Sequence, residues 1–213
     1  SKGNYEGIGI IIATGWPKNN SKKIIGEKEF TGNGVSYCAT CDGFFTKGRI
    51  TSVFGNGHEA VEEALFLTKH AKEINVFCDK DDLEVEAELK EQLLSNENVK
   101  LFTNAKLVEV LGNQYVEKVK VDIAGEIKEM ESDFAFLYLG TKSNNELYQG
   151  FAKLNDEGYI ITDENMACEV EGVWAAGDIR ERTVRQVTTA VADGTLAGIE
   201  AIKYVMKKKR EVK

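Results

Sequence analysis

Cys38 and Cys41 are the residues whose type and spacing most directly suggest chemistry. Two residues separate them, so both sulfurs can share one turn of backbone and cycle between dithiol and disulfide with little movement of the chain. Asp42 follows at once and places a carboxylate within reach of either sulfur. A redox pair beside an acid can exchange disulfides and move the accompanying proton. We therefore predict that Cys38, Cys41 and Asp42 are catalytic residues.

Two structural alternatives compete with the redox interpretation of the pair. A zinc site needs about four ligands, and the remaining cysteines are isolated while the two histidines lie twelve residues apart. We therefore predict no metal site. The second alternative is an inert pair, since free cysteines are often simply buried. The small residues around the pair permit close approach to the backbone, which an inert pair would not require.

Composition limits the classes of function. The 213 residues, of which 42% are hydrophobic, suffice for one large or two small domains. The net charge of −8 argues against a nucleic-acid partner. We expect no membrane association, because no apolar stretch reaches the roughly 20 residues of a span and no signal-peptide pattern is present. Four cysteines do not make a disulfide scaffold, which favours the cytoplasm. The first residue is Ser1 rather than Met, so we expect a processed, truncated or renumbered product.

Hydrophobic patterning predicts alternating strands and helices around these residues. Residues 8–13 are continuously apolar, which predicts a strand buried on both faces. Further strands are predicted over residues 50–54, 74–78, 99–103, 106–111, 115–122, 126–130, 134–139, 159–162 and 173–176. Helices are predicted over residues 58–72, 84–94 and 186–207, and a loop or linker over residues 16–30. This order predicts an α/β fold.

A glycine-rich turn joins the predicted strand 50–54 to the following helix. Its pattern is Gly55-x-Gly57-x-x-Ala60, the dinucleotide-binding fingerprint with Ala as the third small residue. Gly55 permits a tight turn, Gly57 lets the backbone approach a pyrophosphate, and Ala60 lets helix and strand pack closely. The helix N-terminus then offers N–H groups to phosphate.

The end of the next strand bears on which nucleotide would fit. Asp79 can accept hydrogen bonds from a ribose 2′-hydroxyl, which suits NADH. A 2′-phosphate would meet several acidic side chains with only Lys80 in support, so NADPH is disfavoured. A solvated acidic loop without any ligand stays an open alternative.

Taken together, the motifs resemble the low-molecular-weight thioredoxin reductases of bacteria, over nearly the whole chain. The segments that carry the resemblance are Ala13-Thr14-Gly15, Gly34-Val35-Ser36-Tyr37-Cys38-Ala39-Thr40-Cys41-Asp42-Gly43, Glu62-Glu63-Ala64-Leu65-Phe66-Leu67, Ala175-Ala176-Gly177-Asp178 and Arg185-Gln186-Val187. The resemblance implies a flavoprotein with two dinucleotide-binding domains, usually a homodimer.

The family pattern implies a route for the electrons. They would pass from a donor to FAD, then to the Cys38–Cys41 disulfide, and then to the disulfide of a thioredoxin-like partner. By that pattern Cys41 faces the flavin, Cys38 attacks the partner disulfide, and Asp42 manages the proton of the departing thiolate. A helix N-terminus near the pair would support this by lowering a thiol pKa.

The resemblance also implies positions for FAD. Asp178 matches the residue that contacts the ribityl and phosphate region, residues 185–187 match the segment against the isoalloxazine ring, and residues 14–15 match the turn on the other side. The implied positions are Thr14, Gly15, Gly177, Asp178, Arg185, Gln186 and Val187.

Two departures from the family pattern affect these expectations. The family begins with a glycine-rich FAD-binding unit well ahead of the Ala-Thr-Gly turn, whereas twelve residues precede Ala13 here. We therefore expect residues 1–20 to be a remnant of the FAD domain, 21–141 a complete central domain with the CxxC pair, and 142–213 the later part of the FAD domain, with weak or no FAD binding. Second, Cys78-Asp79-Lys80 and Glu84 replace the basic clamp for NADPH. NADH or reduced ferredoxin are the donors that this favours.

Three functions are compatible with the sequence. The first is a flavin-dependent reductase of thioredoxin. The second is a reductase of another disulfide partner on the same frame. The third is an inactive binding module in a truncated form. Reduction of insulin in the presence of a thioredoxin distinguishes them.

Overall fold

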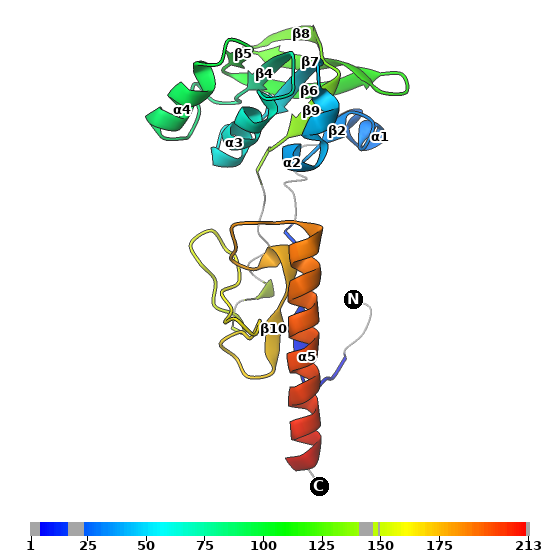
Figure 1. Ribbon diagram of the computed structural model, residues 1–213, viewed down its shortest axis with the longest axis vertical. Coiled ribbons are helices and arrows are strands. Elements are labelled where there is room, and N and C mark those ends of the chain that lie inside the picture. Colours follow the sequence, from blue (N-terminus) through cyan, green and yellow to red (C-terminus); the bar gives the residue numbers. More distant parts are fainter. Residues whose placement is uncertain (1–4, 17–23, 141–146, 149, 212–213) are drawn as a thin grey trace. The chain divides into compact units, whose positions relative to one another are not determined.

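The computed structural model describes residues 5–16, 24–140, 147–148 and 150–211 (Figure 1). The chain divides into unit 1, formed by Ser1–Lys18 and Thr141–Lys213, and unit 2, formed by Asn19–Gly140. The domain boundaries expected from the sequence, after residues 20 and 141, lie outside the described residues.

Unit 2 is built on a parallel sheet of five strands in the order β2-β9-β3-β4-β5. The strands are β2 (Val35–Ser36), β3 (Ile50–Phe54), β4 (Glu73–Phe77), β5 (Val99–Phe102) and β9 (Phe134–Leu137). Strands β3, β4 and β9 are buried at nearly every position. Continuous apolar runs have this outcome because both faces of a parallel sheet are covered.

The two faces of this sheet are covered differently. Val53 and Val76 pack with helices α3 (His58–Leu67) and α4 (Ala87–Leu94). The next residues along the same strands, Phe54 and Phe77, stack at 4.7 Å between ring centroids and pack with the second sheet of the unit. That sheet is antiparallel, in the order β6 (Ala105–Gly112), β7 (Val116–Ile123) and β8 (Glu126–Glu131). Alternation along each strand thus builds two separate cores.

Strand β3, helix α3 and parallel strand β4 form the predicted βαβ unit. Gly55 has φ 155°, and a Cβ there would lie 2.5 Å from the carbonyl oxygen of Tyr138 and 2.7 Å from Cβ of Ala60. A side chain at Gly55 would therefore collide with both the end of β9 and the helix. A Cβ at Gly57 would meet nothing within 4 Å, so this position leaves open space at the helix N-terminus.

Unit 1 contains the parallel pair β1 (Ile10–Ile12) and β10 (Val173–Ala175), followed by the helix α5 (Val187–Glu211). A 3₁₀ helix over Gly177–Ile179 comes directly after β10. Ile12, Ile160 and Ile179 belong to one buried cluster of this unit, while Trp174 packs with Ala197 of α5 in another. None of the helices in the described part of the chain has the length and apolar character needed to cross a membrane.

Several sequence expectations were wrong in detail. Residues 159–162 form isolated bridges through Ile160 rather than a strand. The expected loop over residues 16–30 contains a short helix, α1 (Glu27–Phe30), because buried Phe30 packs into the β6–β7 core; residues 17–23 lie outside the described ranges. Strand β1 is not buried on both faces: Ile10 and Ile11 are 53% and 39% exposed, and its partner among the described strands is β10.

Two helices are shorter than predicted. Helix α3 ends at Leu67, and the chain then turns so that Ala71 can bridge to Lys47. The predicted helix from residue 84 begins at Ala87, because the N–H of Glu84 donates to the carbonyl of Asn56 in the glycine-rich turn. Tertiary contacts decide both ends.

Candidate active site

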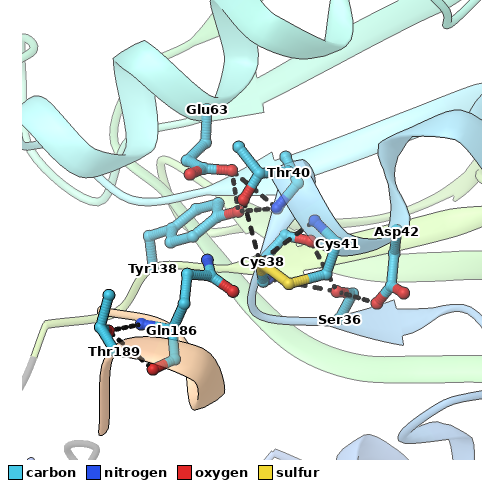
Figure 2. Close-up of a disulfide and its surroundings, with 10 residues drawn as sticks. Ser36, Cys38, Thr40, Cys41, Asp42, Glu63, Tyr138, Gln186 and Thr189 are labelled. Atoms are coloured by element: carbon cyan, nitrogen blue, oxygen red, sulfur yellow. Dashed lines mark hydrogen bonds between the residues drawn. A yellow bond between two sulfur atoms is a disulfide. The ribbon is translucent and has the colours of Figure 1, made fainter. Parts of the chain in front are cut away.

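The redox pair lies where strand β2 runs into a short helix, α2 (Ala39–Asp42). Cys38 is the N-cap of α2, and its sulfur is bonded to that of Cys41 (Figure 2). The N–H of Cys41 also donates to Sγ of Cys38 at 3.2 Å. Cys38 is half-buried and Cys41 is exposed. The sulfur of Cys38 therefore sits at the positive end of a helix, where a thiolate is stabilised.

Small residues around the pair are explained by packing. Ala39 is fully buried, and a Cβ at Gly43 would lie 3.0 Å from the ring of Phe66 and 3.2 Å from Leu67. The segment carrying the cysteines is thus pressed against helix α3, which holds the pair in place.

Asp42 is held beside the pair by Ser36. The hydroxyl of Ser36 donates to Oδ2 of Asp42 at 2.6 Å and accepts the N–H of Cys38 at 3.2 Å. Ser36 is buried and Asp42 is half-buried. The strand β2 therefore fixes the carboxylate that the sequence places next to the sulfurs.

Two aromatic side chains follow shortly after the pair, beyond Asp42 and Gly43, and are exposed to solvent. Phe44 and Phe45 are 69% and 66% exposed. They belong to the 3₁₀ helix over Gly43–Thr46, whose other members Gly43 and Thr46 are buried. The buried residues hold the turn while the two rings are presented outward.

The glycine-rich turn opens onto a pocket of about 490 Å³ within unit 2. Gly55, Gly57, Ala60 and Asp79, all predicted from the sequence, line it together. Its size suits a small-molecule site. The pocket is also lined by Glu59, Lys80, Glu84, Lys106 and Tyr138.

The charges around this pocket are mixed. Lys80 forms an ion pair with Glu84, so its charge is partly offset. Lys106 lies at the start of β6 and lines the same pocket, which strand and helix patterns could not reveal. The sequence-based argument against a 2′-phosphate took only Lys80 into account, whereas both Lys80 and Lys106 line the pocket.

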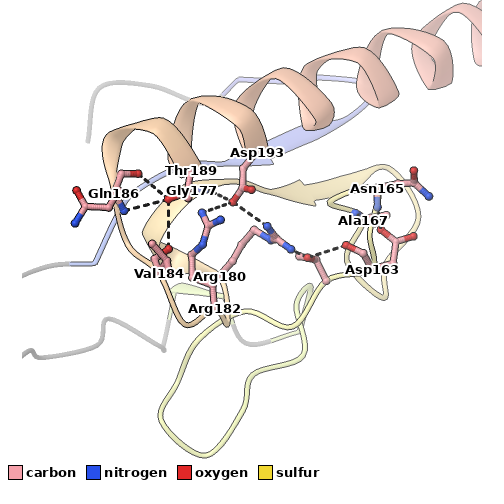
Figure 3. A network of polar contacts seen from close by, with 11 residues as sticks. Asp163, Asn165, Ala167, Gly177, Arg180, Arg182, Val184, Gln186, Thr189 and Asp193 are labelled. Carbon is pink, nitrogen blue, oxygen red and sulfur yellow. Dashed lines mark hydrogen bonds and ion pairs between the residues drawn. The ribbon is translucent and has the colours of Figure 1, made fainter. Parts of the chain in front are cut away.

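In unit 1, the turn after β10 is held by a buried carboxylate. Oδ2 of Asp193 accepts the N–H of Gly177 at 3.0 Å, and Nη1 of Arg180 and of Arg182 each lie 2.8 Å from it (Figure 3). Asp193 is 4% exposed. Gly177 has φ 78°, a backbone conformation that favours glycine. The result is a rigid Gly177–Asp178 turn.

One carboxylate oxygen of Asp178, Oδ1, is buried and has no hydrogen-bond partner among the described residues. The same holds, within that part of the chain, for Nε1 of Trp16 and Nε of Arg185. A buried polar atom without a partner is costly, so these atoms are candidate contacts for a polar ligand.

The other positions predicted for a flavin also lie in unit 1. Oγ1 of Thr14 and the hydroxyl of Tyr148 are 2.6 Å apart, and Gly15 has φ 68° with open space where a side chain would be. The guanidinium of Arg185 lies 4.0 Å from the centre of the Tyr159 ring. The N–H of Gln186 donates to Oγ1 of Thr189, and Val187 begins α5 with 79% of its surface exposed.

Comparison with known proteins agrees with this geometry. The sequence model described as pyridine nucleotide-disulphide oxidoreductase matches residues 2–194. A thioredoxin reductase of Peptoclostridium litorale is 40% identical over 216 residues, covering 96% of this chain and 67% of the relative. The chain belongs to the thioredoxin reductase family. It spans about two thirds of the length of the curated relatives that it matches.

Solved structures of thioredoxin reductases show the same fold. The thioredoxin reductase from Streptococcus pyogenes MGAS5005 superposes with a TM-score of 0.85 at 34% identity, covering 93% of this chain and 66% of that one. A ferredoxin-flavin thioredoxin reductase from Clostridium acetobutylicum gives a TM-score of 0.50 at 28% identity, covering 93% of this chain and 63% of that one. The predicted family and the two-dinucleotide-binding-domain flavoprotein fold are thereby confirmed.

Proposed function

We propose that this chain carries the redox centre of a flavin-dependent reductase that transfers electrons to the disulfide of a thioredoxin. The observation that carries the proposal is the Cys38–Cys41 disulfide at the N-terminus of α2, with the Asp42 carboxylate held beside it by Ser36. The pair, the acid and the helix end together supply a nucleophile and a proton carrier.

The proposed thiol–disulfide exchange with the partner has two steps. The Cys38 thiolate attacks one sulfur of the partner disulfide, which forms a mixed disulfide and releases the first partner thiolate. Cys41, deprotonated, then attacks Sγ of Cys38, which reforms the Cys38–Cys41 bond and releases the second partner thiolate. Two electrons leave the pair, and the two partner thiolates take up two protons, one of which Asp42 is placed to carry.

The unpartnered groups of unit 1 fit the proposed FAD. Oδ1 of Asp178 can accept a hydrogen bond from a ribityl hydroxyl, and Nε of Arg185 and Nε1 of Trp16 can donate. When bound, the flavin supplies the two-electron reduction of the disulfide. The chain's own part is to orient that group through the turn that Asp193 holds rigid.

Phe44 and Phe45 are the proposed contact for the thioredoxin. They are exposed and apolar, and Phe44 lies three residues after Cys41 in the sequence. Aromatic side chains with little conformational freedom are common anchors of protein interfaces.

We propose NADH or reduced ferredoxin, rather than NADPH, as the electron donor. Glu59, Asp79 and Glu84 line the dinucleotide-type pocket, and Lys80 is paired with one of them. The ferredoxin alternative is supported by the similarity to the ferredoxin-flavin enzyme.

The test of function is thioredoxin-dependent reduction of insulin by the FAD-reconstituted protein, with dithionite-reduced flavin as the starting state. We expect stoichiometric reduction of a thioredoxin disulfide, and a Phe44→Ala/Phe45→Ala variant should slow this reduction more at low than at saturating thioredoxin concentration. Reduction of small disulfides with no reduction of thioredoxin would favour the other disulfide partner instead.

The donor is tested by stopped-flow reduction of the flavin. NADH, NADPH and reduced ferredoxin are compared with the same preparation, followed by flavin absorbance. Rapid reduction by NADPH would refute the donor assignment, and a matched Lys106→Ala variant would then show whether Lys106 supplies the missing phosphate contact.

A further inference from the structure

Glu63 contacts the redox helix in a way that the exchange chemistry above does not use. Its Oε2 accepts the N–H of Ala39 at 2.6 Å and the hydroxyl hydrogen of Tyr138 at 3.2 Å (Figure 2). Ala39 is the first residue of α2, directly after Cys38. A carboxylate from helix α3 therefore occupies the N-terminus of the helix that carries the redox pair.

This carboxylate opposes the effect of the helix end on Cys38. The free N–H groups at a helix N-terminus favour a thiolate. A neighbouring negative charge disfavours a second negative charge nearby. Because Sγ of Cys38 accepts the N–H of Cys41 at that same end of α2, the thiolate of Cys38 would experience both influences.

Tyr138 keeps the carboxylate in place. Its hydroxyl donates to Glu63 and accepts the N–H of Ala39 at 3.1 Å, so three groups from three segments close a small network. Burial, followed by the Glu63 charge, raises the pKa of Tyr138 well above its usual range. The hydroxyl therefore remains a donor throughout the pH range in which thiols ionise.

We propose that Glu63 is a positioning residue that lowers the reduction potential of the Cys38–Cys41 pair by destabilising the Cys38 thiolate. The disulfide takes up two electrons, and at neutral pH the reduced pair can keep one sulfur as a thiolate. A charge that disfavours this form makes the reduced pair less stable and hence a stronger reductant. The inference rests on the proposed role of the pair as a redox centre.

Other ionisable groups face the same region. Asp42 lies on α2 itself, Glu59 and Glu63 lie on α3, and Tyr138 follows β9. The negative charges of Asp42 and Glu59 also disfavour a thiolate at Cys38. The effect of Glu63 is therefore isolated by comparing its variant with a variant of a neighbouring acidic residue.

The key variant is Glu63→Gln, which keeps the shape and an acceptor for Ala39 but removes the charge. Glu62→Gln is the control, since Glu62 is the exposed neighbour on the same helix. Each full chain is equilibrated with dithiothreitol buffers, quenched by alkylation and analysed by mass spectrometry. We expect Glu63→Gln to favour the reduced pair about tenfold at pH 7, a rise of about 30 mV, and Cys38 to be alkylated several-fold faster. Glu62→Gln should change neither quantity appreciably.

Charge and structure are separated by pH and by a second variant. The difference between wild type and Glu63→Gln should shrink at acid pH, because both reduced pairs are then fully protonated. Tyr138→Phe removes one hydrogen bond to Glu63 but keeps its charge and the hydrogen bond from Ala39, so it should shift the potential less. An unchanged or lower potential in Glu63→Gln, a difference that persists at acid pH, or an equal shift in Tyr138→Phe would each overturn the inference. If Glu63→Gln does not fold, Glu63→Asp is expected to raise the potential by a smaller amount, and no rise would overturn the inference.

These measurements need neither flavin nor thioredoxin. If the reduction potential rises as expected in Glu63→Gln but the wild-type protein does not reduce thioredoxin, the proposed function alone is rejected. Normal thioredoxin reduction with an unaltered potential in Glu63→Gln would reject this inference alone.

Discussion

The surroundings of the redox pair in unit 2 and those of the Gly177–Asp178 turn in unit 1 differ in how their polar groups are satisfied. Around the pair, Asp42 is bonded to Ser36, and Glu63 holds both Ala39 and Tyr138. Around the turn, the backbone is fixed by Asp193, yet Oδ1 of Asp178 has no partner among the described residues. In one region the chain's own groups satisfy one another, and in the other the chain fixes the backbone but leaves a buried polar atom without a partner among the described residues.

The turn in unit 1 is therefore the region in which a cofactor should act. A ligand that satisfies buried polar atoms stabilises the region that holds them. We therefore expect the pair to show its own thiol chemistry without FAD, and we expect FAD to act mainly on unit 1.

The largest effect should come from removing the pair itself. Cys38→Ser and Cys41→Ser should each lower thioredoxin reduction by about a thousandfold or more, because neither single thiol can complete the two-step exchange. The coupled insulin assay measures this, with Cys168→Ser in unit 1 as the control that keeps activity. In Cys41→Ser, Cys38 should trap thioredoxin as a stable mixed disulfide. Trapping by Cys38→Ser instead would reverse the roles of the two sulfurs.

Asp42→Asn should have the next largest effect, a loss of about a hundredfold in kcat, since the role that we propose for the carboxylate is to move a proton in the exchange. Ser36→Ala should lower kcat less, because it removes one hydrogen bond to Asp42 and leaves the carboxylate. Asp81→Asn, in an exposed loop, is the control. A kcat for Asp42→Asn equal to that of Asp81→Asn would exclude Asp42 as the proton carrier.

A smaller effect is expected on flavin affinity. Asp178→Asn should weaken FAD binding by about tenfold or more, through loss of a charged acceptor. Without FAD, the variant should be about as stable as wild type, because Oδ1 of Asp178 makes no hydrogen bond within the described residues that the substitution could remove. Asp163→Ala is the matched opposite: Oδ1 of Asp163 already accepts the N–H groups of Asn165 and Ala167, so its loss should reduce stability and spare affinity. Calorimetric titration measures the affinity for FAD, and thermal unfolding measures stability. Equal losses of FAD affinity in the two variants would contradict the prediction.

The smallest effect concerns Tyr37, beside the pair. Burial, with its hydrogen bond to Glu27 next, raises the pKa of Tyr37 from 10.0 to about 12. The neutral side chain is therefore favoured in the folded state. Its contribution to the free energy of unfolding is complete below pH 10 and is lost as the pH rises towards 12. We expect a loss of about 1 kcal/mol after solvent screening, measured by urea unfolding across this range. Tyr37→Phe should remove that step, and an identical alkaline loss in the variant would assign it to other groups.

Local sequence determined much of this protein. The βαβ unit around Gly55-x-Gly57-x-x-Ala60 and strand β3 follow from apolar runs and from steric demands that a few neighbouring residues impose. Cys38, Cys41 and Asp42 lie close together in the sequence, so their closeness in space could be predicted without knowledge of the fold. The segments that matched the family likewise were contiguous, which is why the family could be predicted.

Tertiary structure alone decided the rest. Glu63 and Tyr138 lie 24 and 99 residues from Ala39, and only the packing of α3 and β9 against α2 brings them to it. Lys106 joins the pocket because β6 begins at its edge, and Ile160 remains in isolated bridges although its sequence suits a strand. Patterns of neighbouring residues report local conformation and burial, whereas contacts between distant segments depend on how those elements pack, which no short pattern contains.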